Sequence, residues 1–200
     1  MRSIKSVYKF TNFCANISLC SNKPDIIVLT ETWLNEDQDK AFYNIEGYTI
    51  HRSDRNGQIG GGCLIAVSNS LISTPITMPD RGTEHLFVKV TNRNEIFIVG
   101  AAYMPPGCSI NNYISHTEVV ESLATRFPSY KLALFGDYNL AGITWSMNNQ
   151  VLSYNIDDSA SREISDKAIC IGNSFGILQL EQYHPVLVSG KGYTLDLCFC

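Results

Sequence analysis

The sequence contains no long apolar segment. No run of apolar residues approaches the roughly 20 that cross a bilayer, so a membrane span is not predicted. The first twenty residues begin with basic side chains, as a secretion signal does. Lys9, Thr11 and Asn12 then interrupt the continuous apolar stretch that such a signal needs. A signal peptide is therefore not predicted either.

Regularly spaced cysteines are also missing. The seven cysteines are odd in number and scattered, and no two of them form a C-x-x-C pair. This pattern favours neither a disulfide framework nor a zinc site. It is typical of buried or unreactive thiols in a reducing compartment, which predicts an intracellular protein.

An excess of basic residues, the usual mark of a nucleic-acid binder, is missing too. The chain has 15 Lys and Arg residues against 19 Asp and Glu, a net charge of −4. Arg52 and Arg55 in HRSDRNG come nearest to a basic patch, and such a pair is more typical of a solvated turn than of a phosphate clamp. The acidic total does not exclude a phosphate substrate, because a bound divalent metal can supply the main local positive charge.

The apolar residues that are present, 44% of a 200-residue chain, suit one domain with a real core. They form β-branched runs typical of buried strands, between which lie segments with helical spacing. Strands are predicted over residues 26–30, 63–69, 85–90, 95–103, 131–135, 177–181 and 193–200, and helices over 5–20, 110–127 and 161–176. This order predicts an α/β or α+β protein with two packed sheets and helices on their faces.

Polar side chains interrupt these apolar strands, mostly at their ends. Glu31 follows the first strand, Tyr103 ends the fourth, and Asp137 and Asn139 follow the fifth. Taken singly, they have ordinary interpretations as a surface carboxylate, a core aromatic and turn-forming residues. Asp196, between two leucines in TLDLCF, is harder to explain, because a carboxylate on a buried face needs a partner.

Taken together, these side chains fit the hydrolysis of a phosphate ester. Mg²⁺ prefers carboxylate oxygens and keeps several waters, and it neutralises the charge that develops on the phosphate. Glu31 is suited to bind the metal, and Tyr103 to donate a hydrogen bond to the phosphate. Asp137 and Asn139, two positions apart, can face one side of the sheet and hold the attacking water and a phosphate oxygen.

The segments PDIIVLTETWL, GGGCLIAV, AAYMPPG, LALFGDYN and TLDLCF resemble the endonuclease/exonuclease/phosphatase superfamily. More narrowly, they are similar to the endonuclease domain of non-LTR (LINE-type) retrotransposon polyproteins, from about residue 2 to the last. The resemblance implies a four-layer αββα sandwich with two mainly antiparallel sheets. It also implies an endonuclease dependent on Mg²⁺ (or Mn²⁺) that nicks target DNA ahead of reverse transcription. DNA is then the expected partner, with no membrane and no specific protein partner, and the nucleus is where such an element finds its DNA.

The resemblance also implies a role for each candidate residue. Glu31 falls on the metal-binding glutamate and Tyr103 on the phosphate-contacting tyrosine. Asp137 and Asn139 fall on the pair that orients the nucleophilic water and stabilises the transition state. Asp196 falls on the aspartate that hydrogen-bonds the catalytic histidine.

Two departures from the family pattern bear on activity. The family opens with an Asn-bearing strand before an Arg-Ser-Leu-like stretch, and it closes with a Ser-Asp-His motif after the TLDL strand; neither is found in this chain. All four histidines precede Asp196: His51, His85, His116 and His184. The last lies in QYHP, a context typical of a structural or solvated side chain. We therefore expect residues 1–200 to form an incomplete domain that cuts DNA poorly or not at all.

Three other interpretations stay open at this point. The chain can be an inactive remnant of the endonuclease domain, or a superfamily member that acts on another phosphoester, such as an abasic-site nuclease or a lipid phosphatase. A nucleotide-binding role for GQIGGG is less well supported, because no Gly-Lys-Ser/Thr follows and the glycines lead into a strand. A tight entry into a hairpin is the simpler role for them.

Overall fold

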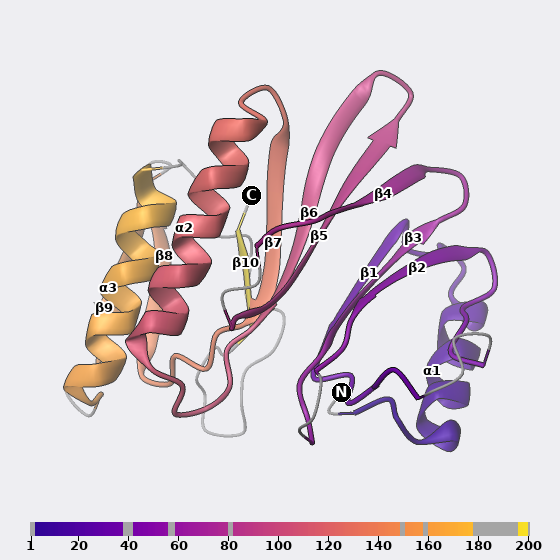
Figure 1. Cartoon of the computed structure of the whole chain (residues 1–200), viewed down its shortest axis with the longest axis horizontal. Coiled ribbons are helices and arrows are strands. Elements are labelled where there is room, and N and C mark those ends of the chain that lie inside the picture. Colours follow the sequence, from indigo (N-terminus) through magenta and orange to yellow (C-terminus); the bar gives the residue numbers. More distant parts are fainter. Residues whose placement is uncertain are drawn as a thin grey trace. The chain divides into compact units, whose positions relative to one another are not determined.

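A computed structural model describes residues 3–37, 42–55, 59–79, 82–148, 151–157, 160–177 and 196–199 (Figure 1). The chain divides into two compact units. Unit 1 comprises Met1–Thr77 and Glu84–Tyr103, and unit 2 comprises Met78–Thr83 and Met104–Cys200. The chain therefore enters unit 2 after Thr77, returns to unit 1 at Glu84, and enters unit 2 again at the peptide bond between Tyr103 and Met104.

Unit 1 contains one helix and two antiparallel sheets. Its elements are α1 (Val7–Leu19), β1 (Ile26–Thr30), β2 (Tyr48–Ser53), β3 (Cys63–Ser68), β4 (Ile72–Ile76), β5 (Glu84–Asn92) and β6 (Glu95–Tyr103). The strand order is β1-β3-β2 in one sheet, and β6-β5-β4 in the other. The first sheet contacts the second, mainly through β3 against β5 and β6. The two packed sheets predicted from the strand-rich sequence are confirmed for this unit.

The core of unit 1 explains why β3 is apolar along almost its whole length. Leu64 and Ala66 of β3 belong to a buried cluster with Phe10 and Ile17 of α1, while the strand also contacts the opposing sheet. Five of its six residues are buried. A strand covered on both faces has no solvent side, so its sequence shows a continuous apolar run instead of alternation.

Unit 2 contains two helices and two strand pairs. Its elements are α2 (Ile110–Arg126), β7 (Lys131–Asp137), β8 (Ile143–Asn148), β9 (Val151–Ile156), α3 (Arg162–Ile177) and β10 (Asp196–Phe199). β7 pairs with β10 and β8 with β9, both antiparallel. The helices α2 and α3 lie side by side (Figure 1) and are joined by ring contacts of His116 with Phe175.

The observed elements match most of the sequence expectations. All three helices agree with the predicted ranges to within two residues, and β6 ends at Tyr103, directly before Met-Pro-Pro, as expected of a strand that meets proline. β2, β4, β8 and β9 were not predicted. β4 contains Pro75 and lies at the edge of its sheet, where a missing backbone N–H is tolerated. The strand predicted over 177–181 lies almost wholly outside the described residues.

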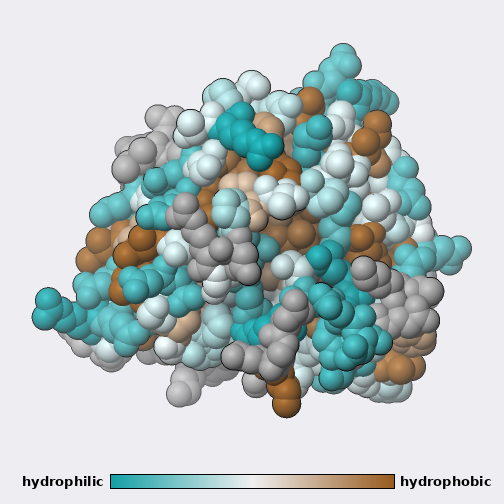
Figure 2. Space-filling model, viewed as in Figure 1, coloured by the Kyte–Doolittle hydropathy of each residue, from teal (hydrophilic) through white to brown (hydrophobic). Residues whose placement is uncertain are grey.

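Within the described part of the chain, every helix is too short or too polar to cross a bilayer. On the face drawn in Figure 2, hydrophobic residues form small separate groups among hydrophilic ones. Exposed side chains such as Leu19, Ile59 and Ile72 are ordinary for a folded chain.

Candidate active site residues at two strand ends

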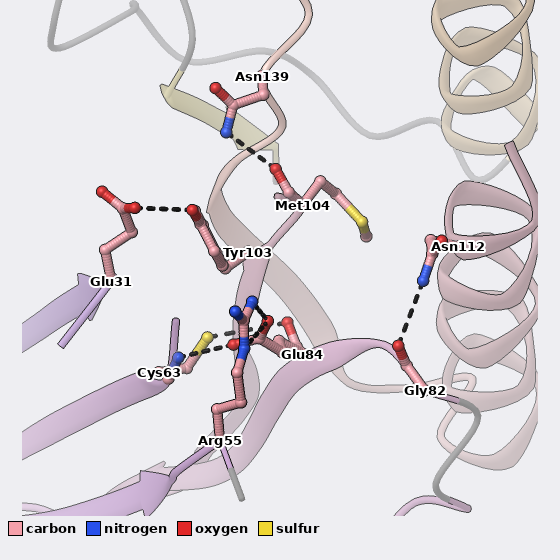
Figure 3. Close-up of polar contacts among 10 residues, drawn as sticks. Glu31, Arg55, Cys63, Gly82, Glu84, Tyr103, Met104, Asn112 and Asn139 are labelled. Atoms are coloured by element: carbon pink, nitrogen blue, oxygen red, sulfur yellow. Dashed lines mark hydrogen bonds and ion pairs between the residues drawn. The ribbon is translucent and has the colours of Figure 1, made fainter. Parts of the chain in front are cut away.

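The first candidate cluster, in unit 1, joins Glu31 to Tyr103. Glu31 directly follows β1, and Tyr103 is the last residue of β6. The Tyr103 hydroxyl donates a hydrogen bond of 2.7 Å to Glu31 Oε1 (Figure 3). Hydrogen bonds to a carboxylate are shorter and stronger than neutral ones. Two residues that the sequence assigned to one phosphate-handling site, 72 positions apart, are thus in direct contact.

The backbone at Glu31 has a conformation that non-glycine residues rarely adopt. Its φ is 52°, in the left-handed region, and Trp33 two positions later has a φ of 61°. Such a conformation costs free energy and persists only where the surrounding structure enforces it. One restraint comes from the start of the chain: the Ser3 and Ile4 N–H groups donate to the Glu31 and Thr32 carbonyls, at 2.9 and 3.0 Å.

The second restraint on this segment comes from the glycines before β3. The Thr32 N–H donates to the Gly62 carbonyl (3.2 Å), and the Trp33 N–H donates to that of Gly61 (2.9 Å). Both glycines have positive φ, and a Cβ on Gly62 would lie 2.6 Å from Thr32 Oγ1. The glycines enter β3, as predicted from the sequence. They also hold the Glu31 segment in place, a role that the sequence did not indicate.

The ion pair between Arg55 and Glu84, next to these glycines, was not predicted from the sequence. Glu84 Oε1 accepts hydrogen bonds from Arg55 Nε, at 2.8 Å, and from a second guanidinium nitrogen, while Glu84 Oε2 accepts one from the Gly62 N–H at 2.7 Å (Figure 3). The Arg55 guanidinium also lies 5.9 Å from the centre of the Tyr103 ring. Glu84 is therefore linked to both halves of the Glu31–Tyr103 contact: through Gly62 to the Glu31 segment, and through Arg55 to the tyrosine.

A sequence signal for Glu84 existed. It is the first residue of β5 and lies opposite Tyr103 in the β5–β6 register. The rule that identified the other candidates, a polar residue at the end of an apolar strand, would have found it if the strand had been predicted to begin one residue before His85.

The expectation that the two arginines form a solvated turn is wrong. Arg52 donates to both carboxylate oxygens of Asp54, at 3.2 and 2.6 Å, and to the Asn35 carbonyl. Its side chain is only 8% exposed, and that of Arg55 is 20% exposed. Both cations are paired with carboxylates of unit 1, so the observed contacts of these arginines are structural.

The second candidate cluster, in unit 2, contains Asp137 and Asn139. Burial alternates along β7 and past its end, with Gly136, Tyr138 and Leu140 buried and the two candidates between them half-buried. This alternation agrees with the prediction that Asp137 and Asn139 share one side. The Asn139 N–H donates to Asp137 Oδ1 at 3.1 Å, and Asn139 has a φ of 48°.

Met104 ties this strand end to the start of unit 2. Its N–H donates to the Asp137 carbonyl at 2.9 Å, and its carbonyl accepts a hydrogen bond of 2.8 Å from Asn139 Nδ2 (Figure 3). Asp196, the first residue of β10, is paired in register with Asp137. The backbone thus brings the third candidate of this unit next to the first.

Each described histidine contacts a residue that is not among the candidates. His51 on β2 is 2.9 Å from Ser73 Oγ, and burial lowers its pKa. The His85 ring on β5 lies tilted against Phe87, and His116 on α2 contacts Tyr138. His184 lies outside the described residues.

Four free thiols lose reactivity through burial: Cys14, Cys63, Cys108 and Cys170. Burial raises the pKa of Cys63, and the nearby Glu84 carboxylate raises it further. Burial also raises the pKa of Cys14, Cys108 and Cys170. Raised pKa values keep a thiol protonated, and a protonated thiol is a poor nucleophile and a poor metal ligand.

The donor chemistry at the candidate residues fits a hard divalent cation. Among the described residues, no three His, Cys, Asp or Glu side chains form a cluster that could hold a metal. Mg²⁺ is nevertheless commonly held by one or two carboxylates with water in the remaining positions. A carboxylate has about four acceptor positions, so Glu31 can accept the Tyr103 hydrogen bond and bind a cation at the same time.

Comparison with known proteins supports the fold. No protein-family model and no curated protein matches the sequence. Among solved structures, the chain resembles the endonuclease domain of TRAS1, a telomere-specific non-LTR retrotransposon, with a TM-score of 0.61 and 15% identity over 99% of this chain and 82% of that one. It also resembles the human Nocturnin catalytic domain with bound sulfate anion, with a TM-score of 0.56 and 12% identity over 96% and 74% of the two chains.

At these identities the likeness concerns the fold alone. It confirms the fold class implied by the sequence motifs: an α/β protein with the fold of these two solved domains.

Proposed function

We propose that this chain is a divalent-metal-dependent phosphodiesterase of the retrotransposon endonuclease type, with DNA as its substrate. The observation that carries the proposal is the 2.7 Å hydrogen bond between Tyr103 and Glu31. The sequence assigned both residues to one phosphoester site from chemistry and resemblance, and their contact across 72 positions supports that assignment.

The common role of the four candidates rests on the sequence resemblance. In unit 1 the Tyr103 hydroxyl donates to Glu31, and in unit 2 the Met104 backbone is hydrogen-bonded to the Asp137 carbonyl and to Asn139 Nδ2. Each pair is thus held within its own unit. Because the resemblance assigns all four residues to one site, we propose that they act on the same phosphodiester.

Each side chain has a separate role in the proposed reaction. Glu31 would hold Mg²⁺ or Mn²⁺, which when bound neutralises charge developing on the phosphate. Tyr103 has a single O–H, which it donates to Glu31 in this structure; when substrate binds, the hydroxyl turns and donates to a non-bridging phosphate oxygen instead. Asp137 accepts a hydrogen bond from the attacking water and orients it, while Asn139 stabilises the phosphate oxygens.

We expect residues 1–200, taken by themselves, to carry out the proposed reaction slowly. Asp196 takes the place of the residue that orients a histidine in the family, but none of the four histidines follows it in the sequence. His51 and His116 are bonded to Ser73 and Tyr138 instead. A missing general base typically lowers the rate by about 10²–10⁴-fold.

Nicking of supercoiled plasmid with Mg²⁺, Mn²⁺ or excess EDTA tests the proposal. We expect slow conversion to the nicked form that requires the metal and is lost in Asp137→Ala. Fast nicking that is lost in the same variant would support the nuclease but refute the expected impairment. Nicking that is unaffected by EDTA or by Asp137→Ala would contradict the proposal.

Metal binding provides a second test that does not depend on the rate. Free Mn²⁺ is measured by electron paramagnetic resonance during titration with the wild type and with Glu31→Gln. We expect weaker binding by Glu31→Gln and unchanged binding by Glu118→Gln, a control carboxylate on α2. Binding that depends on Glu31 without any nicking would identify an inactive remnant of the domain.

The net charge of −4 favours one alternative substrate class. A small phosphoester needs no extended basic face, whereas duplex DNA usually meets one. The same preparation is therefore assayed for phosphate release from an inositol polyphosphate. Release that is lost in Asp137→Ala, with the plasmid left intact, would assign the chain to a small phosphoester instead of DNA.

A further inference from the structure

We propose that Tyr113 and His116 are positioning residues that fix Asp137 and Asn139 in place through Tyr138. The proposal rests on the proposed function, because it concerns the residues assigned there to the attacking water and the phosphate. Its structural part, control of the end of β7 by α2, can be tested separately.

Tyr138 is anchored at two points by residues of one helix. The Tyr113 hydroxyl donates a short hydrogen bond to the Tyr138 carbonyl, and His116 Nε2 lies 3.0 Å from the Tyr138 hydroxyl. Tyr113 and His116 are three positions apart on α2, so they lie next to each other on one helix face. All three side chains are at most 1% exposed.

Rings from the second helix complete the packing around Tyr138. Phe175 of α3 meets the Tyr138 ring at 85° and the His116 ring at 72°, with centroids 6.4 and 6.1 Å apart. Edge-to-face contacts of this kind stabilise one ring orientation over others. The Tyr138 ring is therefore held by α3 as well as by the two polar contacts from α2.

Fixing Tyr138 restrains both of its neighbours. Asp137 and Asn139 flank Tyr138 directly and share the side opposite to its buried ring. Asn139 has a left-handed backbone, which costs free energy and needs enforcement from the surrounding structure. An anchor on both the carbonyl and the hydroxyl of Tyr138 supplies that enforcement one residue away.

The hydrogen bond from Tyr113 persists over a wide pH range. Burial raises the pKa of the Tyr113 hydroxyl, and the neighbouring Cys108 raises it further. The hydroxyl therefore stays protonated and keeps its role as donor at every pH at which the protein is handled.

Hydrogen exchange of the Asn139 backbone amide, measured by NMR in the whole chain, tests the proposal. This amide is bonded to Asp137 Oδ1 and reports on the geometry of the pair. We expect Tyr138→Phe and His116→Phe to accelerate its exchange about tenfold, the effect of losing one buried hydrogen bond. The Leu134 amide in β7 should keep its wild-type rate, and His116→Gln should restore much of the protection.

Tyr48→Phe is the matched control. Tyr48 is also a buried tyrosine, and its hydroxyl donates to a backbone carbonyl, that of Pro24, at 2.6 Å in unit 1. This variant loses the same kind of bond but leaves Tyr138 untouched, so the Asn139 amide should not change. If a variant at Tyr138 or His116 fails to fold, Tyr113→Phe removes the other anchor and is measured in the same way.

Two results would overturn the inference. In the first, the variants at Tyr138, His116 or Tyr113 (the anchor variants) would exchange the Asn139 amide no faster than Tyr48→Phe does. In the second, they would accelerate exchange of the Leu134 amide as much as that of Asn139, which would show a general loss of stability. The plasmid assay separates this outcome from failure of the proposed function. In a chain that nicks DNA, the anchor variants should lower kcat and leave KM unchanged. In a chain that does not nick, the exchange rates still decide the structural part.

Discussion

The ends of β1 and β7 both place candidate residues on a left-handed backbone, but they are stabilised in different ways. Glu31 is held by main-chain hydrogen bonds and by an Arg55–Glu84 ion pair whose side chains are about one-fifth exposed. Asn139 follows Tyr138, whose ring is fully buried and anchored by buried side chains of α2. The first support depends on charge and on glycine, and the second on aromatic packing.

This difference shows that one kind of functional geometry can rest on unlike physical forces within a single chain. A partly exposed ion pair is weakened by salt, whereas buried hydrogen bonds and ring contacts are screened very little. The two ends should therefore respond differently to salt, to added side-chain volume and to loss of a single hydroxyl group.

The largest effect is expected from adding a side chain at Gly61, which is hydrogen-bonded to the segment that follows Glu31. Gly61→Ala places a methyl group against the Glu84 carboxylate and the Arg55 guanidinium, at a φ of 68°. We expect a loss of about 3 kcal/mol in the free energy of unfolding, measured by urea denaturation, together with weaker Mn²⁺ binding.

Gly47→Ala is the control for Gly61→Ala. Gly47 has a φ of 86°, but no heavy atom would lie within 4 Å of an added Cβ. The free energy of unfolding of Gly47→Ala should therefore fall only by the cost of placing alanine in the left-handed region, about 1–2 kcal/mol. Equal losses in the two variants would show that the contact with the ion pair does not matter.

A smaller effect is expected from removing the charge of Glu84. Glu84→Gln keeps an acceptor for the Gly62 N–H but loses the ion pair with Arg55. We expect a loss of about 1 kcal/mol at low salt, which shrinks in 1 M NaCl because screening already weakens the pair in the wild type.

Tyr138→Phe sharpens the same comparison from the other strand end. Its destabilisation should depend little on salt, because the contact it removes is fully buried and is screened very little. A salt dependence equal to that of Glu84→Gln would contradict the distinction between the two supports. Both variants are measured by urea denaturation at about 0.05 M and about 1 M NaCl. Salt screens exposed charges only moderately at the lower concentration and strongly at the higher one.

Tyr103→Phe should affect stability less than it affects function. The variant loses the hydrogen bond to Glu31, worth about 0.5–1.5 kcal/mol, while the main-chain bonds that hold Glu31 remain. In the plasmid assay it should lose nicking by about 10²-fold, the usual effect of removing one donor to a developing charge. Stability and nicking reduced in proportion would indicate a structural role only.

The smallest effect concerns the pH dependence of unit 1. Burial lowers the pKa of His51 from 6.5, so the folded state favours the neutral ring. The stability from this preference is present above pH 6.5 and is lost as the pH falls below it, because the unfolded chain then binds the proton more readily. In urea denaturation at several pH values, the free energy of unfolding should fall less steeply with decreasing pH in His51→Gln than in the wild type.

Much of unit 1 and of the helical part of unit 2 could be predicted from the sequence. Apolar β-branched runs identified β1, β3 and β6, and helical spacing identified all three helices. β2 and β8 are mixed in polarity, so neither periodicity stands out. The polar strand ends identified Glu31, Tyr103, Asp137 and Asn139. Glu84 was missed because its strand was predicted to begin at His85, and the partner of Arg55 was missed because that arginine was interpreted as part of a solvated turn.

The sequence by itself determined the three helices, most of the apolar strands and the residue types at the strand ends, because apolar periodicity and residue chemistry are local properties. Only the tertiary structure decided that Tyr103 donates to Glu31, that Glu84 lies between Arg55 and Gly62, and that Tyr138 is anchored by α2. These contacts join residues 22 to 72 positions apart. They depend on strand register and on enforced left-handed backbone, which no local pattern specifies.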